Sequence, residues 1–244
     1  VLVDEYDKPM LDAMDTGLKT RVGDNEMLIE DHNRETLKAF YSVFKLADAD
    51  LRFVFLTGVT KFAQVSVFSG FNNARDISMN PRFDTICGIS REELNNVFAS
   101  SIEELANTNM LSVEEAKSQL QQRYDGYHFS NGMTDIYNPF SLLNAFADDN
   151  IRDYWFASGT PSYLMRLLAH SKEDIQGIIA RSYEAQEFVD YRATVEAPVP
   201  MIYQSGYLTI KGYNREDDEY KLDFPNHEVA SGFLTLLASG YFQT

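Results

Sequence analysis

The chain begins with an apolar run that is followed directly by acidic residues. Residues 1–3 are Val-Leu-Val, and Asp4 and Glu5 come immediately after them. A second segment, residues 51–56, is apolar except for Arg52 and is followed by Thr57. Strands buried on both faces, as in a parallel sheet, have uninterrupted apolar sequences. The first run therefore predicts a strand of a parallel sheet, and residues 51–56 predict a second strand.

The segment between these runs predicts a helical connection. Residues 8–31 contain Pro and Gly and predict a short helix followed by a loop. Asp31 is expected to cap a longer helix that ends at about Leu46. Apolar residues of this helix recur at i, i+3, i+4 and i+7, namely Leu37, Phe40, Tyr41 and Phe44. Strand, helix and strand in this order predict a right-handed parallel crossover.

Residues 59–88 predict loops, and helix-start signals follow them. Ser90 and Ser112 each precede a Glu by three positions, which is the pattern of a capping box. Asn138 and Thr160 each precede a Pro, the favoured first residue of a helix. A bundle of short helices is therefore predicted over roughly residues 90–180.

The last part of the chain changes to strand-like alternation. Residues 203–211 and 219–224 alternate and are rich in aromatic and β-branched side chains, with a polar segment between them. This pattern predicts a β-hairpin. A final helix is expected from Pro225 and Asn226, with one apolar face made of Val229, Phe233, Leu234 and Leu237. Helices followed by a hairpin are compatible with a winged-helix module.

Composition and charge narrow the classes of partner. The 244 residues carry a net charge of −16, from 37 acids and 21 bases. Such a balance argues against broad binding to nucleic acid and against anionic membranes. No apolar run approaches the roughly 20 residues of a membrane span. We expect a cytoplasmic protein that holds its anionic ligand in a protected pocket.

Cysteine, histidine and the chain ends add three expectations. Cys87 is the one cysteine, so no intrachain disulfide can form, and we expect its thiol to be buried as a small apolar side chain. The four histidines are scattered, which makes a structural zinc site improbable. The chain starts without Met and ends in the apolar segment 236–241, so we expect a fragment of a longer protein.

The acidic pair after the first run suggests phosphoryl chemistry. In P-loop NTPases an acid at the tip of such a strand holds Mg²⁺, and a neighbouring Glu can activate water. Asp4 suits the first role and Glu5 the second. Thr57 ends the neighbouring strand, where its hydroxyl could contact the γ-phosphate or the attacking water. Taken alone, these residues fit equally an acidic solvated turn and a Thr that caps a turn.

Seven runs in order resemble one known family. Together they cover nearly the whole chain: VDEYDKP (3–9), FVFLTGVTKF (53–62), VSVFSGFNN (65–73), YDGYHF (124–129), YNPFSLLN (137–144), YW through GTP (154–161) and QSGYLTI (204–210). The chain resembles the AAA-ATPase-like proteins of bacteria and some archaea. These ATP-binding proteins often bear a C-terminal nuclease-like domain of the PD-(D/E)XK superfamily.

The resemblance implies a fold and its division into segments. It implies an α/β protein with a partial P-loop NTPase parallel sheet in residues 1–88. A helical lid would follow in residues 89–185, and a winged-helix-like α+β segment with the hairpin in residues 186–244.

The resemblance also implies roles for individual residues. Asp4 and Glu5 would be the Walker B acids, with Mg²⁺ on Asp4, and Thr57 the sensor. Thr60 and Lys61 are further candidates for contact with ATP. Arg82 and Arg75 lie where an arginine finger could reach the γ-phosphate; solvation or pairing with acids is the alternative.

One departure from the family pattern limits this expectation. No G-x-x-x-x-G-K followed by Ser or Thr is present, so the main anchor of the triphosphate is missing. The resemblance implies a nuclease-like domain after Thr244, which the printed sequence does not include. We expect the parent protein to bind ATP and Mg²⁺ and to contact its nuclease-like domain, and this segment alone to lack ATP binding.

Two alternatives remain beside the ATPase. A metal-dependent nuclease could use Asp4, Glu5, Asp7 and Lys8, but the Glu-x-Lys at residues 115–117 falls in a predicted helix. A non-catalytic interaction or regulatory module is the second. Its partner would be a protein, because four consecutive acids, residues 216–219, occupy the expected wing and would repel phosphate. The aromatic segment 124–129 is expected to pack the lid.

Overall fold

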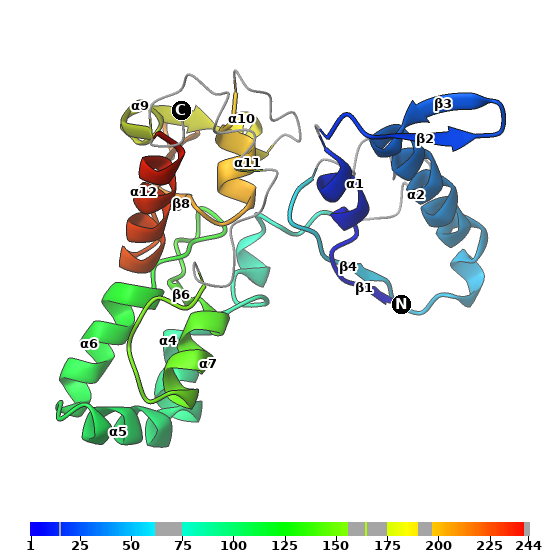
Figure 1. Cartoon of the computed structure of the whole chain (residues 1–244). Helices are drawn as coiled ribbons and strands as arrows, with labels where there is room; N and C mark the ends of the chain where they lie inside the picture. Colours follow the sequence, from blue (N-terminus) through cyan, green and yellow to red (C-terminus); the bar gives the residue numbers. More distant parts are fainter. Residues whose placement is uncertain (15, 62–74, 156–163, 165–174, 190–196, 242–244) are drawn as a thin grey trace. The chain divides into compact units, whose positions relative to one another are not determined.

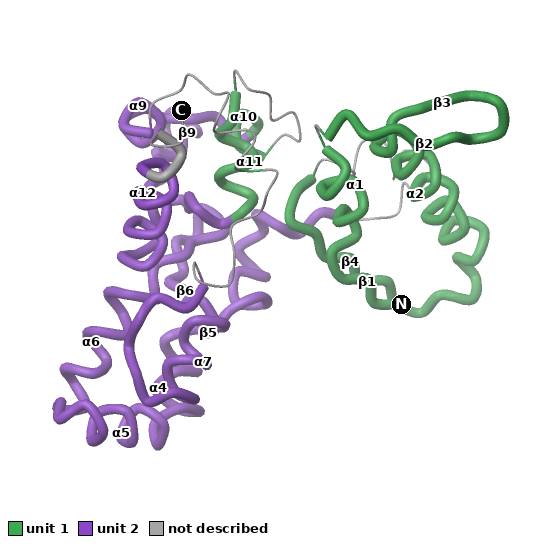
Figure 2. The backbone as a smooth tube through the Cα atoms, viewed as in Figure 1, with its two compact units in different colours: residues 1–75, 161–173, 186–205 green, residues 76–160, 174–185, 206–244 purple. Residues whose placement is uncertain are grey.

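The computed structural model places most of the chain in helices and strands (Figure 1). The structure describes residues 1–14, 16–61, 75–155, 164, 175–189 and 197–241. The chain divides into two compact units, each built from separate stretches (Figure 2). The first comprises residues 1–75, 161–173 and 186–205, and the second residues 76–160, 174–185 and 206–244. The division into segments 1–88, 89–185 and 186–244 stays a prediction.

The first unit contains a pair of parallel strands. β1 (Leu2–Val3) pairs with β4 (Phe55–Leu56), so that Leu2 lies opposite Phe55 and Val3 opposite Leu56. Between them lie α1 (Lys8–Ala13), α2 (Ile29–Leu46) and the 3₁₀ turn η1 (Asp48–Asp50). The predicted parallel crossover is confirmed, although β4 covers only the end of the predicted strand.

The connection before α2 differs from the prediction. The expected loop contains an antiparallel hairpin of β2 (Lys19–Val22) and β3 (Asn25–Leu28). Gly23 turns the chain between them with a φ of +62°, a conformation that side chains disfavour. α2 begins at Ile29 without a side-chain cap. Asp31 therefore is not its cap, and pairs instead with Arg34 at 2.6 Å.

The core of the first unit lies between α1, α2 and the strand pair. It is formed by the buried side chains of Tyr6, Met10, Tyr41 and Phe44. Phe40 was predicted for the same face of α2 but is 55% exposed. The strand region also leaves apolar side chains in solvent, since Leu2 is 76% and Phe53 63% exposed.

Short helices dominate the second unit, as predicted. They are α4 (Arg91–Val97), α5 (Ala99–Thr108), α6 (Val113–Tyr124), α7 (Pro139–Ala147) and α9 (Ile175–Ala180), and the 3₁₀ turn η2 (Pro81–Phe83) precedes them. β5 (Ile89–Ser90) pairs with β6 (Ile136–Tyr137). α4 and α6 begin with the predicted capping boxes, and Asn138 caps α7. The predicted cap at Thr160 lies outside the described residues.

The hydrophobic core of this helical region collects one face of each helix. Its buried residues include Leu94 of α4, Ile102 and Leu105 of α5, Leu120 of α6 and Leu142 of α7. Each of these side chains is at most 2% exposed. Removing so much apolar surface from water is the main force that holds the short helices together.

A three-stranded antiparallel sheet completes the second unit. β9 (Glu219–Asp223) lies between β7 (Ser182–Glu184) and β8 (Thr209–Asn214). The β8–β9 hairpin confirms the prediction, but β8 starts late because α11 (Val199–Gln204) takes up the preceding residues. α10 (Ala185–Val189) follows β7.

α12 (His227–Tyr241) is fixed by a buried carboxylate. Glu228 is 0% exposed and accepts hydrogen bonds from Ser141 Oγ at 2.7 Å and from the backbone N–H groups of Tyr154 and Trp155. Val229 and Phe233 lie on the buried face as predicted. Leu234 does not, because its side chain is 52% exposed.

Three remaining expectations concern Cys87, membrane-spanning helices and the fold class. Cys87 is exposed, so the expectation of a buried thiol was wrong. Among the described helices, none has both the length and the apolar character needed to cross a bilayer. The coarse prediction of an α/β fold is confirmed by the mixture of helices with small parallel and antiparallel sheets.

Candidate functional site

The structure brings Asp4 and Thr57 into direct contact. Asp4 follows β1 and Thr57 follows β4, so both lie at the carboxyl ends of paired parallel strands. Thr57 Oγ1 donates a hydrogen bond to Asp4 Oδ1 at 2.5 Å. The pairing continues past the strands, because Thr57 N–H donates to Val3 O and Tyr6 N–H donates to Thr57 O. Backbone pairing therefore sets the approach of the carboxylate to the hydroxyl.

Glu5 has an unusual backbone conformation between β1 and α1. Its φ of +50° lies in the left-handed region, which is uncommon for a residue with a side chain. Its carbonyl oxygen accepts a hydrogen bond from Lys8 N–H at 3.0 Å, which turns the chain into α1. Backbone strain of this kind is common at functional sites. Asp4 and Glu5 are both solvent-exposed and can reach a ligand.

Asp7 is the acid that holds this edge together. The residue is 0% exposed and stands at the N-terminus of α1, yet its side chain does not cap that helix. Its carboxylate accepts hydrogen bonds from Val59 N–H at 3.1 Å, Thr60 N–H at 2.6 Å and Thr60 Oγ1 at 2.9 Å. The segment after β4 is thereby tied to the segment after β1.

Neighbouring residues reinforce this tie. The Tyr6 hydroxyl donates to Thr60 O at 2.8 Å. A side chain at position 58 would meet the Tyr6 ring at 2.4 Å and Asp7 Oδ1 at 2.8 Å, so Gly58 is required. Burial raises the pKa of Tyr41, and the nearby charge of Asp7 raises it further. Asp7 thus places a negative charge beside the core of the first unit.

Thr60 and Lys61 were both predicted to contact a nucleotide. The Thr60 side chain is 4% exposed and its hydroxyl donates to Asp7, so the geometry favours a structural role over contact with a cofactor. Lys61 is half-buried, and its N–H donates to Gln204 Oε1 at 2.7 Å. Its role toward a nucleotide stays a prediction.

The two arginine candidates lie outside this group. Arg82 belongs to η2 of the second unit, is exposed, and its N–H donates to Asn80 Oδ1 at 3.1 Å. Arg75 is exposed and is the first residue that the structure describes after Lys61. Their assignment as arginine fingers stays a prediction.

Sequence reasoning missed the function of Asp7. It placed this residue only in the disfavoured nuclease alternative, although the sequence offered an Asp directly before Lys8 and Pro9, a helix-start signal. That signal predicts a local cap. The actual partners, Val59 and Thr60, lie 52 and 53 residues further along the chain.

The residues at the ends of β1 and β4 lie within a segment that matches a known protein family. Residues 1–68 match the family model described as predicted AAA-ATPase. The match contains β1, α1, α2, β4 and the residues from Asp4 to Lys61 discussed above. The resemblance suggested by the sequence motifs is thus supported for this part of the chain.

A curated relative extends the similarity over the whole chain. The uncharacterized protein in the vnfD 5′ region of Azotobacter chroococcum mcd 1 is 35% identical over 246 residues, which cover 99% of this chain and 43% of the relative. The chain therefore spans less than half the length of that relative. No solved structure matches this chain.

Proposed function

We propose that Asp4, Glu5 and Thr57 form the Mg²⁺- and water-positioning half of an ATP-hydrolysing site. The observation that supports this most strongly is the hydrogen bond between Thr57 and Asp4 at the carboxyl ends of β1 and β4. Ligands of open α/β sheets bind at that end of the strands. The match of residues 1–68 to predicted AAA-ATPases is compatible with ATP and Mg²⁺ as ligands.

Each side chain has a distinct part in this proposal. Asp4 contributes a carboxylate oxygen to Mg²⁺, an ion that prefers oxygen ligands. Glu5 accepts the proton of the attacking water as a general base. Thr57 orients Asp4 and senses the γ-phosphate through its hydroxyl. Lys61 and Arg82 are candidates for further contacts with the phosphates.

The proposed site needs a phosphate-binding loop from elsewhere in the parent protein. The printed sequence has no such motif, and without its backbone N–H groups and Lys the triphosphate has no cradle. The exposed side chains of Leu2 and Phe53 support further protein packing on this sheet. Parallel sheets are almost always covered on both faces.

The remaining segments complete the proposal for the parent protein. Residues 1–88 belong to the P-loop core, residues 89–185 to the lid and residues 186–244 to a winged-helix-like segment that contacts a nuclease-like domain. A non-catalytic interaction module is the second candidate. The exposed apolar side chains of Val97 and Met110, 68% and 94% exposed, favour a protein partner for the second unit.

The test is ATP turnover by the full-length parent protein. Glu5→Gln should retain binding of a fluorescent ATP analogue and lose turnover by about a hundredfold or more, as expected for removal of a general base. Asp4→Ala should weaken Mg²⁺-dependent binding. Asp12→Asn is the matched control. Asp12 is an exposed acid of α1 and forms an exposed ion pair with Lys8. Unchanged hydrolysis in Glu5→Gln would contradict the assignment.

A further inference from the structure

The side chain of Gln204 joins three segments of the first unit. Gln204 is the last residue of α11, and its Oε1 accepts a hydrogen bond from Lys61 N–H at 2.7 Å. Its Nε2 donates to Phe188 O at 3.2 Å and to Val189 O at 3.1 Å, both at the end of α10. The two helices also contact each other, because the rings of Phe188 and Tyr203 pack edge to face with centroids 4.7 Å apart. One amide therefore ties both helices to the segment after β4.

The hydrogen-bonding groups of this amide match their surroundings in one orientation only. A glutamine amide has one oxygen that accepts and one nitrogen that donates two hydrogens. The oxygen of Gln204 meets an N–H group, and its nitrogen meets two carbonyl oxygens. Rotating the amide by half a turn would place acceptor against acceptor and donor against donor. A carboxylate at this position would keep the bond to Lys61 and repel both carbonyls of α10.

Lys61 ends a short segment, residues 57–61, that also contains part of the candidate site. Its first residue, Thr57, donates a hydrogen bond to Asp4. The carbonyl oxygen of Thr60, directly before Lys61, accepts a hydrogen bond from the Tyr6 hydroxyl at 2.8 Å. The 57–61 segment is thus bound to the candidate site at one end and to Gln204 at the other.

α10 and α11 lie where the chain enters and leaves the first unit. This unit includes residues 186–205, whereas residues 174–185 and the chain from 206 onward belong to the second unit (Figure 2). Gln204 lies next to the last residue before the exit, and the carbonyls that it binds follow soon after the entry. Coupling between distant sites is carried by contiguous contacts of this kind. A displacement at Lys61 therefore acts directly on both points of passage.

We propose that Gln204 is a positioning residue that couples the 57–61 segment to α10 and α11. The coupling rests on the proposed function, because nucleotide binding at Asp4 and Thr57 is the event that it transmits. When Mg²⁺ with ATP orders the 57–61 segment, Lys61 N–H fixes the Gln204 amide, and the amide fixes both helices. The occupancy of the ATP site is thereby conveyed to the two points at which the chain passes between the units.

The first test needs no nucleotide. Tyr6→Phe removes one hydrogen bond from Thr60 O and keeps the ring. In the full-length parent, the Ser205 amide, which donates to Met201 O, should then exchange about threefold faster, as expected for partial loss of one hydrogen bond. In a Gln204→Met background the same substitution should leave this exchange unchanged. Equal effects in both backgrounds would overturn the coupling.

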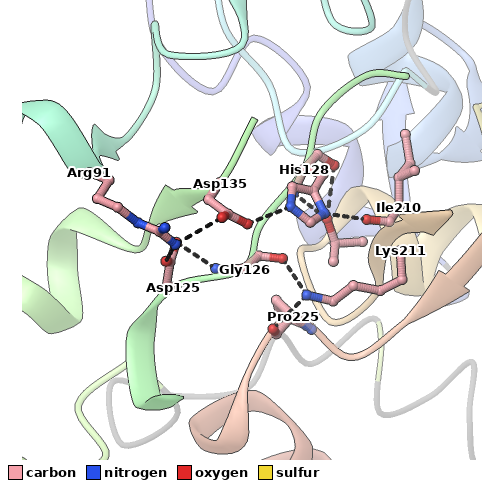
Figure 3. Close-up of polar contacts among 9 residues, drawn as sticks. Arg91, Asp125, Gly126, His128, Asp135, Ile210, Lys211 and Pro225 are labelled. Carbon is pink, nitrogen blue, oxygen red and sulfur yellow. Dashed lines mark hydrogen bonds and ion pairs between the residues drawn. The ribbon is translucent and has the colours of Figure 1, made fainter. Parts of the chain in front are cut away.

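A control variant and a control reporter separate coupling from general destabilisation. Lys211→Met removes hydrogen bonds within the second unit, from Nζ to Gly126 O at 2.6 Å and to Pro225 O at 2.9 Å (Figure 3). This variant should leave the response of Ser205 to Tyr6→Phe intact. The amides of α2 are the control reporter and should respond less than Ser205. Loss of the response in Lys211→Met, or an equally large response throughout α2, would overturn the proposal.

The second test adds a non-hydrolysable ATP analogue with Mg²⁺ to the parent. Exchange should slow in the 57–61 segment, α10 and α11 of the wild type, but in Gln204→Met only in the 57–61 segment. Gln204→Glu keeps the acceptor for Lys61 and repels the carbonyls of α10, so α10 alone should lose its response. Slowing of both helices in Gln204→Met would overturn the coupling and leave the ATP site in place. A wild type in which none of these segments slows would contradict the proposed function, and the first test then decides the coupling.

Discussion

Removal of the Asp7 carboxylate should destabilise the first unit strongly. In Asp7→Ala, Thr60 N–H and Thr60 Oγ1 lose their acceptor in a buried position, and Val59 N–H loses its acceptor in a partly buried one. A buried polar group without a partner costs about 1–3 kcal/mol, and such costs do not add fully. We therefore expect the free energy of unfolding of this unit to fall by about 4 kcal/mol.

A double-mutant cycle assigns part of this loss to one contact. Thr60→Val removes the hydroxyl but keeps the backbone N–H bond to Asp7. We expect it to cost about 1.5 kcal/mol, and the double variant with Asp7→Ala to show a coupling of about 1 kcal/mol. Asp12→Asn is the control. Its ion pair with Lys8 is exposed, so it should change stability by less than about 0.5 kcal/mol.

Native-state hydrogen exchange is the suitable assay, because the two units need not unfold together. The amides of Thr57 and Tyr6 report on the strand edge, since they donate to Val3 O and Thr57 O. Their protection should fall in Asp7→Ala and stay unchanged in Asp12→Asn. Equal, small effects of the two substitutions would refute the view that Asp7 holds this edge together.

Two further predictions concern the second unit. Burial raises the pKa of Glu228 more than its hydrogen bonds from Ser141, Trp155 and Tyr154 lower it. The folded state therefore binds a proton more tightly than the unfolded state, and this contribution to stability is lost as pH rises. Urea titrations should show that the wild type loses stability relative to Glu228→Gln between acidic and neutral pH. A stability difference that stays constant with pH would contradict this expectation. Gly126→Ala should lower the free energy of unfolding by about 2 kcal/mol or more, measured by thermal unfolding. The reason is that φ at this position is +96° and the new Cβ would lie 2.4 Å from Pro225 O. An unchanged stability would show that the loop can move to make room.

The sequence predicted elements whose signals are local. Mainly apolar segments indicated β1 and β4, and the capping boxes at Ser90 and Ser112 indicated the starts of α4 and α6. The β2–β3 hairpin was missed because its strands are short and mixed in polarity. The Gly23 signal between them was present, but a Gly alone does not distinguish a hairpin from a loop.

Only the residues at the strand ends of the candidate site could be predicted from the sequence. Asp4, Glu5 and Thr57 follow apolar runs, so their place at the strand ends could be derived. The contacts of Asp7 could not, because its partners lie 52 and 53 residues away in sequence. Burial of a polar side chain depends on which distant groups satisfy it, and periodicity does not include that information.

The central claim is that Mg²⁺ with ATP binds at the edge formed by Asp4 and Thr57. The most direct measurement replaces Mg²⁺ by paramagnetic Mn²⁺ in the ATP-loaded full-length parent and records which amide signals broaden. Signals of Asp4, Glu5, Thr57 and Gly58 should broaden first, and the effect should vanish in Asp4→Ala. Broadening centred elsewhere, or unchanged in Asp4→Ala, would contradict the claim.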